Sequence, residues 1–175
     1  MKTPLYDVHV GLGARMAPFG GWDMPIQYEG ILAEHQHTRT VCGLFDICHM
    51  GEFELSGPTA EADLERLLTQ SVKSIAIGQC KYGFLLNDKG GVIDDLTCYR
   101  LAADQFMLVV NAGTRAGDAE WIANRLSPGT RFQDISAWTG KLDIQGPQSR
   151  ARLEEALGTR AGDAEWIANR LSPGT

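Results

Sequence analysis

Two neighbouring carboxylates, Asp94 and Asp95, stand in the middle of a stretch that otherwise has the composition of a β-strand. Asp is disfavoured in strand interiors, so both side chains need either solvent or specific hydrogen-bond donors. Successive side chains of a strand point to opposite faces, and the two carboxylates therefore lie on different sides. The Asp94 side also carries Val92, Leu96 and Cys98, and the Asp95 side also carries Ile93, Thr97 and Tyr99.

This carboxylate pair has two interpretations, and both remain open from the pattern alone. In the first, the strand lies at the edge of its sheet and Asp94 is solvated. In the second, Asp95 lines a pocket with Thr97 and Tyr99 and accepts a hydrogen bond from a nitrogenous ligand. A carboxylate in that position can orient an amine or accept its proton. The second interpretation predicts a binding site on the Asp95 side of the strand.

Asn111 ends the next expected strand, where it either caps the following helix or presents its amide to a ligand. Other reactive side chains give weaker patterns. Cys48 and His49 are neighbours on an expected strand and point apart, so we expect no catalytic Cys–His pair. His35 and His37 face different ways on a helix, and the cysteines form no C-x-x-C pair. We therefore expect no metal site.

The composition excludes several classes of protein. The 175 residues carry a net charge of −6 and are 43% hydrophobic, which is typical of a globular protein with one large domain or two small ones. Lys and Arg do not cluster, so we expect no nucleic-acid partner. The longest apolar run, residues 106–110, is too short to span a membrane. With no apolar signal segment near Met1, we expect no membrane partner and a bacterial cytoplasmic location.

Asp95 belongs to an expected trio of strands over residues 82–86, 92–101 and 105–110, joined by tight turns. Residues 1–28 show no clear periodicity and are expected to be irregular. Mixed helices and antiparallel strands predict an α+β fold rather than a doubly wound one. The other expected elements are a helix over 30–42 that ends at Gly43, a strand over 52–55, helices over 59–68 and 114–126, strands over 132–135 and 141–145, and a helix over 148–157.

Two kinds of internal similarity are present. Residues 113–130 and 158–175 share the sequence GTRAGDAEWIANRLSPGT without a single change. Repeat architectures need at least three units, so a recent duplication or an assembly error is the better explanation. We therefore expect residues 158–175 to be foreign to the original fold. An older similarity joins residues 53–58, FELSGP, to residues 142–147, LDIQGP, and predicts two related strand–turn–helix units.

Four segments carry a resemblance to a known family. They are GGWDMP at 20–25, GLFDICHMGEF at 43–53, GGVIDDL at 90–96 and VVNA at 109–112. In order and spacing they resemble the aminomethyltransferase (T-protein) family of the glycine cleavage system. The similarity runs from Lys2 to about Leu157. The HMGEF and GGVIDDL segments favour this family over related folate-binding dehydrogenase domains and a folate-binding tRNA-modification protein.

The resemblance implies a domain organisation. T-proteins have three domains around a folate-binding hole and are roughly twice as long as this chain. Residues 1–51 with 141–157 would form an incomplete first domain, and residues 52–140 would form the whole middle α+β domain. The later part of the family's sequence, including glutamate and arginine contacts to the folate tail, has no counterpart in this chain. The resemblance therefore implies a fragment that is inactive alone.

The resemblance also implies an activity. T-proteins transfer the methylene of the aminomethyl group on the lipoyl arm of the H-protein to tetrahydrofolate, and ammonia is released. The second Asp of the family's IDD motif, here Asp95, helps align the folate nitrogens. Met50, Tyr82, Tyr99 and Asn111 match positions that line the folate cavity. Tetrahydrofolate is thus the implied co-substrate, the lipoylated H-protein is the implied partner, and no metal is implied.

An alternative from another class remains open. A chain that keeps only the middle domain of this superfamily would serve as a non-catalytic module that binds folate or another protein. Ammonia release from aminomethylated H-protein in the presence of tetrahydrofolate separates the two possibilities, because only the enzyme performs it.

Overall fold

The computed structural model describes residues 1–158. The described chain divides into two compact units, the first formed by Met1–His49 and the described residues from Gly140 to Gly158, and the second by Met50–Thr139. Helices and antiparallel sheets occur in both, which confirms the predicted α+β class. Apart from Gly158, the second copy of the duplicated segment lies outside the described residues, so the expectation for it stays a prediction.

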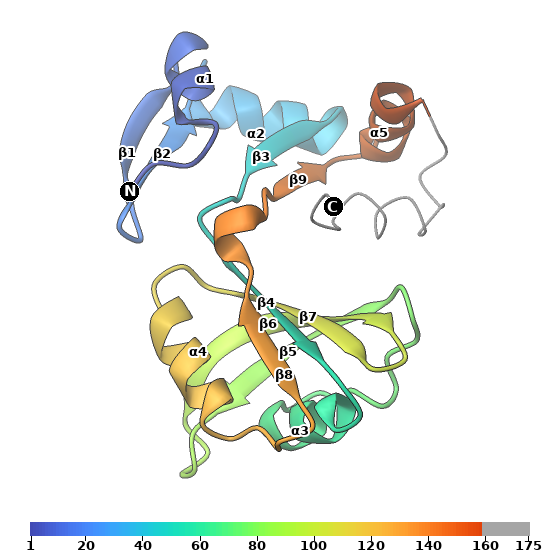
Figure 1. Cartoon of the computed structure of the whole chain (residues 1–175). Coiled ribbons are helices and arrows are strands. Elements are labelled where there is room, and N and C mark those ends of the chain that lie inside the picture. The colour runs from blue at the N-terminus through green and yellow to red at the C-terminus, as the bar shows by residue number, and fades with distance from the viewer. Residues whose placement is uncertain (159–175) are drawn as a thin grey trace. The chain divides into compact units, whose positions relative to one another are not determined.

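The second unit is built on a five-stranded antiparallel sheet with the strand order β5-β6-β7-β4-β8 (Figure 1). The trio expected around Asp95 is confirmed as β5, β6 and β7. Because β6 lies between β5 and β7, it is not an edge strand, and the interpretation that placed Asp94 at a solvated edge is wrong. The strands are β4 Gly51–Ser56, β5 Cys80–Leu86, β6 Val92–Ala102, β7 Gln105–Val110 and β8 Arg131–Asp134.

Two helices, α3 (Ala60–Leu67) and α4 (Arg115–Ala123), contribute to the core of this sheet. The apolar face of α3 packs into this core, where Leu64 is fully buried and Ala60, Leu67 and Leu68 are buried beside it. From α4, Ile122 enters the same cluster. The strands supply alternate side chains to that cluster, as the period of a half-buried strand requires. These strand residues are Phe53, Leu55, Leu85, Leu96, Cys98, Phe106, Leu108 and Val110.

The first copy of the duplicated segment forms the predicted helix, which is α4. It ends at Ala123, before the expected end at residue 126. Thr114 occupies the N-cap position, but its hydroxyl donates to the Asn111 carbonyl oxygen at 3.2 Å and caps no helix N–H. After β8, a single turn of 3-10 helix, η1, spans Ser136–Trp138.

The first unit contradicts the expectation that residues 1–28 are irregular. They form a short helix and a β-hairpin whose two-residue turn is Gly20–Gly21, with φ of 56° and 84°. Such a turn needs positive φ at both positions, and paired glycines supply it without strain. The elements of this unit are α1 Tyr6–Gly11, β1 Arg15–Phe19, β2 Trp22–Gln27, α2 Ile31–Thr40, β3 Gly43–Asp46, β9 Leu142–Gln145 and α5 Ser149–Leu157.

Gly43 does not cap α2, which corrects the expectation for this residue. The helix ends at Thr40, and Gly43 begins β3, where it pairs with Gln145 of β9. A side chain at residue 43 would collide with the Thr38 hydroxyl. Close approach of the helix, rather than a left-handed turn, is therefore the reason for glycine here.

The two related strand–turn–helix units are confirmed at the level of local structure. β4 leads through Gly57 into α3, and β9 leads through Gly146 into α5. The two turn glycines have nearly the same φ, 119° and 118°. Each also approaches a neighbouring backbone so closely that a Cβ would strike a carbonyl oxygen, of Gly129 and of Thr38 respectively. The shared Gly-Pro turn thus reflects a shared geometry.

A buried polar cluster joins distant parts of the first unit. Asp46 accepts hydrogen bonds from the Thr3 hydroxyl at 2.6 Å and from the Cys48 N–H at 2.9 Å, and it contacts His9 Nε2 at 2.9 Å. His9 Nδ1 meets the Tyr28 hydroxyl at 2.6 Å. Burial opposes ionisation of Asp46, but these bonds outweigh it and lower its pKa to about 2. The cluster ties α1 and β3 to Tyr28, the residue that follows β2.

Candidate active site

Asp94 and Asp95 lie on opposite sides of β6, as the alternation predicts. Asp94 is 5% exposed and shares the buried face with Leu96 and Cys98. Asp95 is exposed on the other face, where Thr97 and Tyr99 are half-buried. The sheet therefore presents one of the two carboxylates outward and encloses the other.

The strand register brings Asn111 to both carboxylates. Thr97 of β6 pairs with Val109 of β7, so Asn111, just past the end of β7, comes level with Asp95. The backbone N–H of Asn111 donates to Asp94 Oδ2 and its Nδ2 donates to Asp94 Oδ1, both at 2.9 Å. The same Nδ2 donates to Asp95 Oδ1 at 3.0 Å. The sequence left two roles open for Asn111, a helix cap and an amide presented to a ligand. Its side chain does not cap α4, and it bridges the two carboxylates.

Tyr82 holds the second oxygen of Asp95. It comes from β5, and its hydroxyl donates to Asp95 Oδ2 at 3.2 Å. Partial desolvation of the phenol, together with the bond to Asp95, raises the pKa of Tyr82, so the hydroxyl keeps its proton and stays a donor. The Tyr82 ring packs edge-to-face against Phe84 with centroids 5.4 Å apart. Asp95 is thus fixed by one donor on each oxygen.

The remaining two residues named from the resemblance, Met50 and Tyr99, lie in different places beside and on this sheet. Met50 is half-buried and immediately precedes β4, whose first residue, Gly51, pairs with Val110. Met50 and Asn111 are therefore the next residues beyond the last pair of β4 and β7. Tyr99 lies on the Asp95 side of β6, further along the strand. The structure joins Tyr82, Asp95 and Asn111 by hydrogen bonds, places Tyr99 on the same sheet and places Met50 just before β4.

One residue that the sequence analysis did not single out belongs to this network. Asp118, on α4, is 0% exposed, and neither of its oxygens makes a hydrogen bond of normal geometry with a described residue. Its polar neighbours are the Asp94 carboxylate and the Thr114 hydroxyl. Burial raises the pKa of Asp118 to about 7, a shift that Thr114 opposes and Asp94 reinforces. Asp118 lies four residues before the buried Ile122, so helix spacing indicated that the two side chains share a face.

Removing the charge of Asp118 is expected to stabilise the protein in a pH-dependent way. The folded state keeps this proton up to about pH 7, whereas the unfolded chain loses it near the ordinary value of 3.8. The stability that protonated Asp118 contributes is thus fully present below about pH 4 and is lost as the pH rises to 7. Asp118→Asn should raise the free energy of unfolding by about 2–4 kcal/mol at pH 8 and by little at pH 4.

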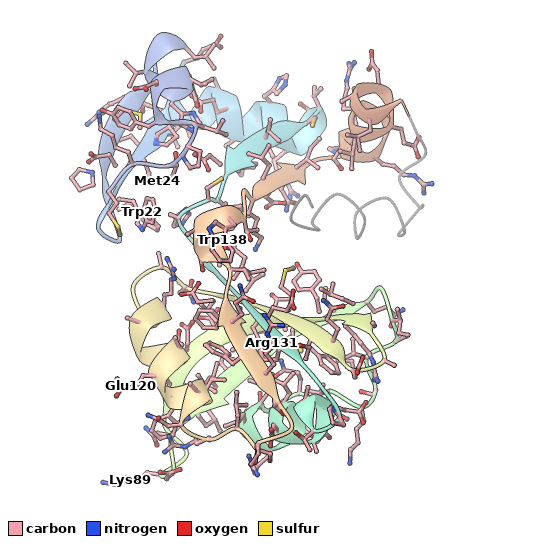
Figure 2. The ribbon with its side chains drawn as sticks, in the orientation of Figure 1. Trp22, Met24, Lys89, Glu120, Arg131 and Trp138 are labelled. Atoms are coloured by element: carbon pink, nitrogen blue, oxygen red, sulfur yellow. The ribbon has the colours of Figure 1, made fainter. Side chains whose placement is uncertain are left out.

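Urea denaturation at the two pH values measures this difference. Glu120→Gln is the matched control, because Glu120 lies on the same helix and projects outward (Figure 2). The control should change stability by less than about 0.5 kcal/mol. Equal stabilisation by Asp118→Asn at both pH values would show that ionisation of Asp118 is not the cause.

Within residues 1–158, no group of three or more His, Cys, Asp or Glu side chains could hold a metal ion. In the same part of the chain, no helix has the length and apolar character needed to cross a membrane.

Comparison with known protein families identifies a match over most of the chain. Residues 5–170 match the family described as the GCVT N-terminal domain. The chain therefore belongs to this family, and the resemblance inferred from the four motifs is confirmed.

Several aminomethyltransferases are similar to this chain. The one from Desulforamulus reducens is 46% identical over 153 residues, which cover 87% of this chain and 42% of that protein. The one from Listeria monocytogenes is 39% identical over 149 residues, covering 85% and 41%. A solved structure, the glycine cleavage system aminomethyltransferase T from Bartonella henselae, matches with a TM-score of 0.87 at 38% identity. That match covers 93% of this chain and 45% of the other.

Proposed function

We propose that this chain is the N-terminal part of a tetrahydrofolate-dependent aminomethyltransferase of glycine cleavage, with a bacterial cytoplasmic location. The protein would take the methylene from the aminomethyl-lipoyl arm of the H-protein, pass it to tetrahydrofolate and release ammonia. The family match and the names of the bacterial relatives support this proposal. The chain spans only about 42% of the length of such a relative, so the activity belongs to the longer protein.

The observation that carries the proposal is the fixed, outward-facing carboxylate of Asp95. Asn111 holds one oxygen at 3.0 Å and Tyr82 holds the other at 3.2 Å. A carboxylate offers about four acceptor positions, so positions remain for an N–H of a ligand. Held in this way, Asp95 can orient a folate nitrogen toward the methylene carbon and accept a proton from it.

The surroundings of Asp95 suit a flat heterocycle. Tyr82 is 59% exposed and Phe84 is 37% exposed, which leaves the edge-to-face ring pair open beside the carboxylate. Exposed aromatic faces next to a fixed polar group are typical of sites that bind planar ligands. We propose that Met50 and Tyr99 line the same folate site.

We also propose how the chain relates to the longer protein. The second unit corresponds to a whole middle domain, and the first unit corresponds to part of a first domain. The remaining walls of the folate site would then come from the part of the protein that the relatives have in addition. On this proposal the 175-residue chain releases no ammonia by itself.

A chimera tests the proposal. Residues 1–157 would replace the matching part of the aminomethyltransferase from Desulforamulus reducens, with the parent enzyme as reference. The chimera should release ammonia from aminomethylated H-protein when tetrahydrofolate is added, and the 175-residue chain should not. A folded chimera that binds tetrahydrofolate without releasing ammonia would instead favour the non-catalytic folate-binding module.

A further inference from the structure

Asp118 occupies an unusual environment for an acid. It is fully buried on α4, and the titratable group that acts on it is another acid, Asp94 of β6. Arg115, three residues earlier, does not neutralise it, because both of its bonded nitrogens donate to Asp134 Oδ2, at 2.8 and 2.9 Å. The Thr114 hydroxyl opposes the upward shift in the pKa of Asp118 but does not cancel it, and it donates to the Asn111 carbonyl oxygen at 3.2 Å. A buried carboxyl that lies near another acid and is not neutralised by a cation lowers the stability of the fold. A purely structural role at this position would therefore favour a neutral residue.

Asp94 is the acid that acts on Asp118, and a hydrogen bond between the two would depend on a proton. Ionised carboxylates are acceptors only, so Asp94 and Asp118 can bond to each other only when one of them is protonated. Asp94 already accepts two hydrogen bonds from Asn111, which favour its ionised form. The proton therefore belongs on Asp118, in agreement with its raised pKa. Asp118 then becomes the third donor to Asp94.

The bonds of Asp94 continue to the proposed catalytic carboxylate. Asn111 uses one nitrogen, Nδ2, for Asp94 Oδ1 at 2.9 Å and for Asp95 Oδ1 at 3.0 Å. Any shift of Asp94 therefore moves the amide that positions Asp95. The series Asp118, Asp94, Asn111 and Asp95 thus runs from the buried side of α4 to the exposed face of the sheet.

We propose that Asp118 is a positioning residue, which donates its carboxyl proton to Asp94 and so holds Asn111 and Asp95 in the geometry that the reaction needs. This inference rests on the proposed function for its catalytic consequence, but its structural part concerns residues 94–118 alone. When Asp118 loses its proton, two buried carboxylates repel each other and Asn111 loosens its hold on Asp95. The array should therefore be well ordered below about pH 7 and less so above it.

Nuclear magnetic resonance of the 175-residue chain tests the structural part. The backbone and side-chain amide signals of Asn111 should titrate between pH 5 and 9 with a midpoint near 7. Asp118→Asn, whose amide can still donate to Asp94, should remove this titration, and Glu120→Gln should leave it unchanged. Asn111 signals without a midpoint near 7, or with the same midpoint in Asp118→Asn, would overturn the proposal whether or not the chain belongs to an active enzyme.

Kinetics of the chimera test the catalytic part. Asp118→Ala, which has no donor, should lower kcat by about 10- to 100-fold with little change in KM for the H-protein. Asp118→Asn should recover most of that loss and should lack the decline of kcat above about pH 7. Equal loss in both variants, or a pH profile that Asp118→Asn does not alter, would contradict a positioning role. If the unsubstituted chimera is inactive, the proposed function fails, and the titration of Asn111 still decides the inference.

Discussion

Asp95→Asn in the chimera is expected to lower kcat for ammonia release by about 100-fold or more. The substitution keeps the shape of the side chain but removes the charge that orients the folate nitrogen and accepts its proton. Because Asp95 is exposed, the free energy of unfolding should change by less than about 1 kcal/mol. Loss of rate without loss of stability would identify a group that acts on the substrate.

The control for this prediction is Asp104→Asn, since Asp104 is an exposed acid in the turn between β6 and β7. It should leave both the rate and the stability unchanged. A similar loss of rate in Asp104→Asn would show that net charge, rather than the position of Asp95, matters. An Asp95→Asn chimera with more than about a tenth of the original rate would contradict a catalytic role for Asp95.

The neighbouring substitution, Asp94→Asn, should have a larger effect on stability than the same change at a solvated residue. Asp94 is buried and accepts hydrogen bonds from both nitrogens of Asn111. An amide in its place cannot accept on both sides, so one donor of Asn111 loses its partner. We therefore expect Asp94→Asn to lower stability and rate together, whereas Asp95→Asn lowers the rate alone.

The side of the strand on which Asp95 lies could be predicted from the sequence, because the two-residue period of β6 depends only on local backbone geometry. The surroundings of Asp94 could not be predicted with the same certainty. Its neighbours Leu96 and Cys98 indicated a buried face, but the donors that satisfy it come from Asn111, seventeen positions away in sequence. Alternation shows which side chains share a face, and tertiary pairing decides what they meet.

Asp118 illustrates a further limit of sequence reasoning. Its place on the inner face of α4 follows from the spacing to Ile122, yet acids are rarely fully buried, so an exposed position was the natural expectation. The expectation of irregular structure for residues 1–28 was wrong for another reason. Their hairpin is short and its strands are not fully alternating, so the Gly20–Gly21 turn was the informative signal. In both cases a local rule indicated the right structure: helix spacing for Asp118 and the two-glycine turn for residues 1–28. A more general pattern pointed the other way, namely the rarity of buried acids and the absence of clear periodicity.

The 175-residue chain is expected to bind tetrahydrofolate about 100- to 10,000-fold more weakly than the chimera does. The resemblance to the family implies that contacts to the folate tail come from the later part of its sequence, and charged hydrogen bonds of this kind contribute about 1.5–3 kcal/mol each. Loss of two such bonds accounts for the expected factor, since about 1.4 kcal/mol corresponds to a tenfold change in affinity. The Asp95 face alone would then contact only the ring system of the ligand.

Titration calorimetry of both proteins with tetrahydrofolate measures this difference, with Asp95→Asn in each as the control for the site. Asp95→Asn should weaken binding in the chimera, because the carboxylate bound by Tyr82 and Asn111 is the proposed partner of the folate nitrogens. Micromolar binding by the 175-residue chain, within tenfold of the chimera, would mean that this chain already holds the groups that determine affinity. Binding that Asp95→Asn does not weaken would place the ligand away from this face of the sheet.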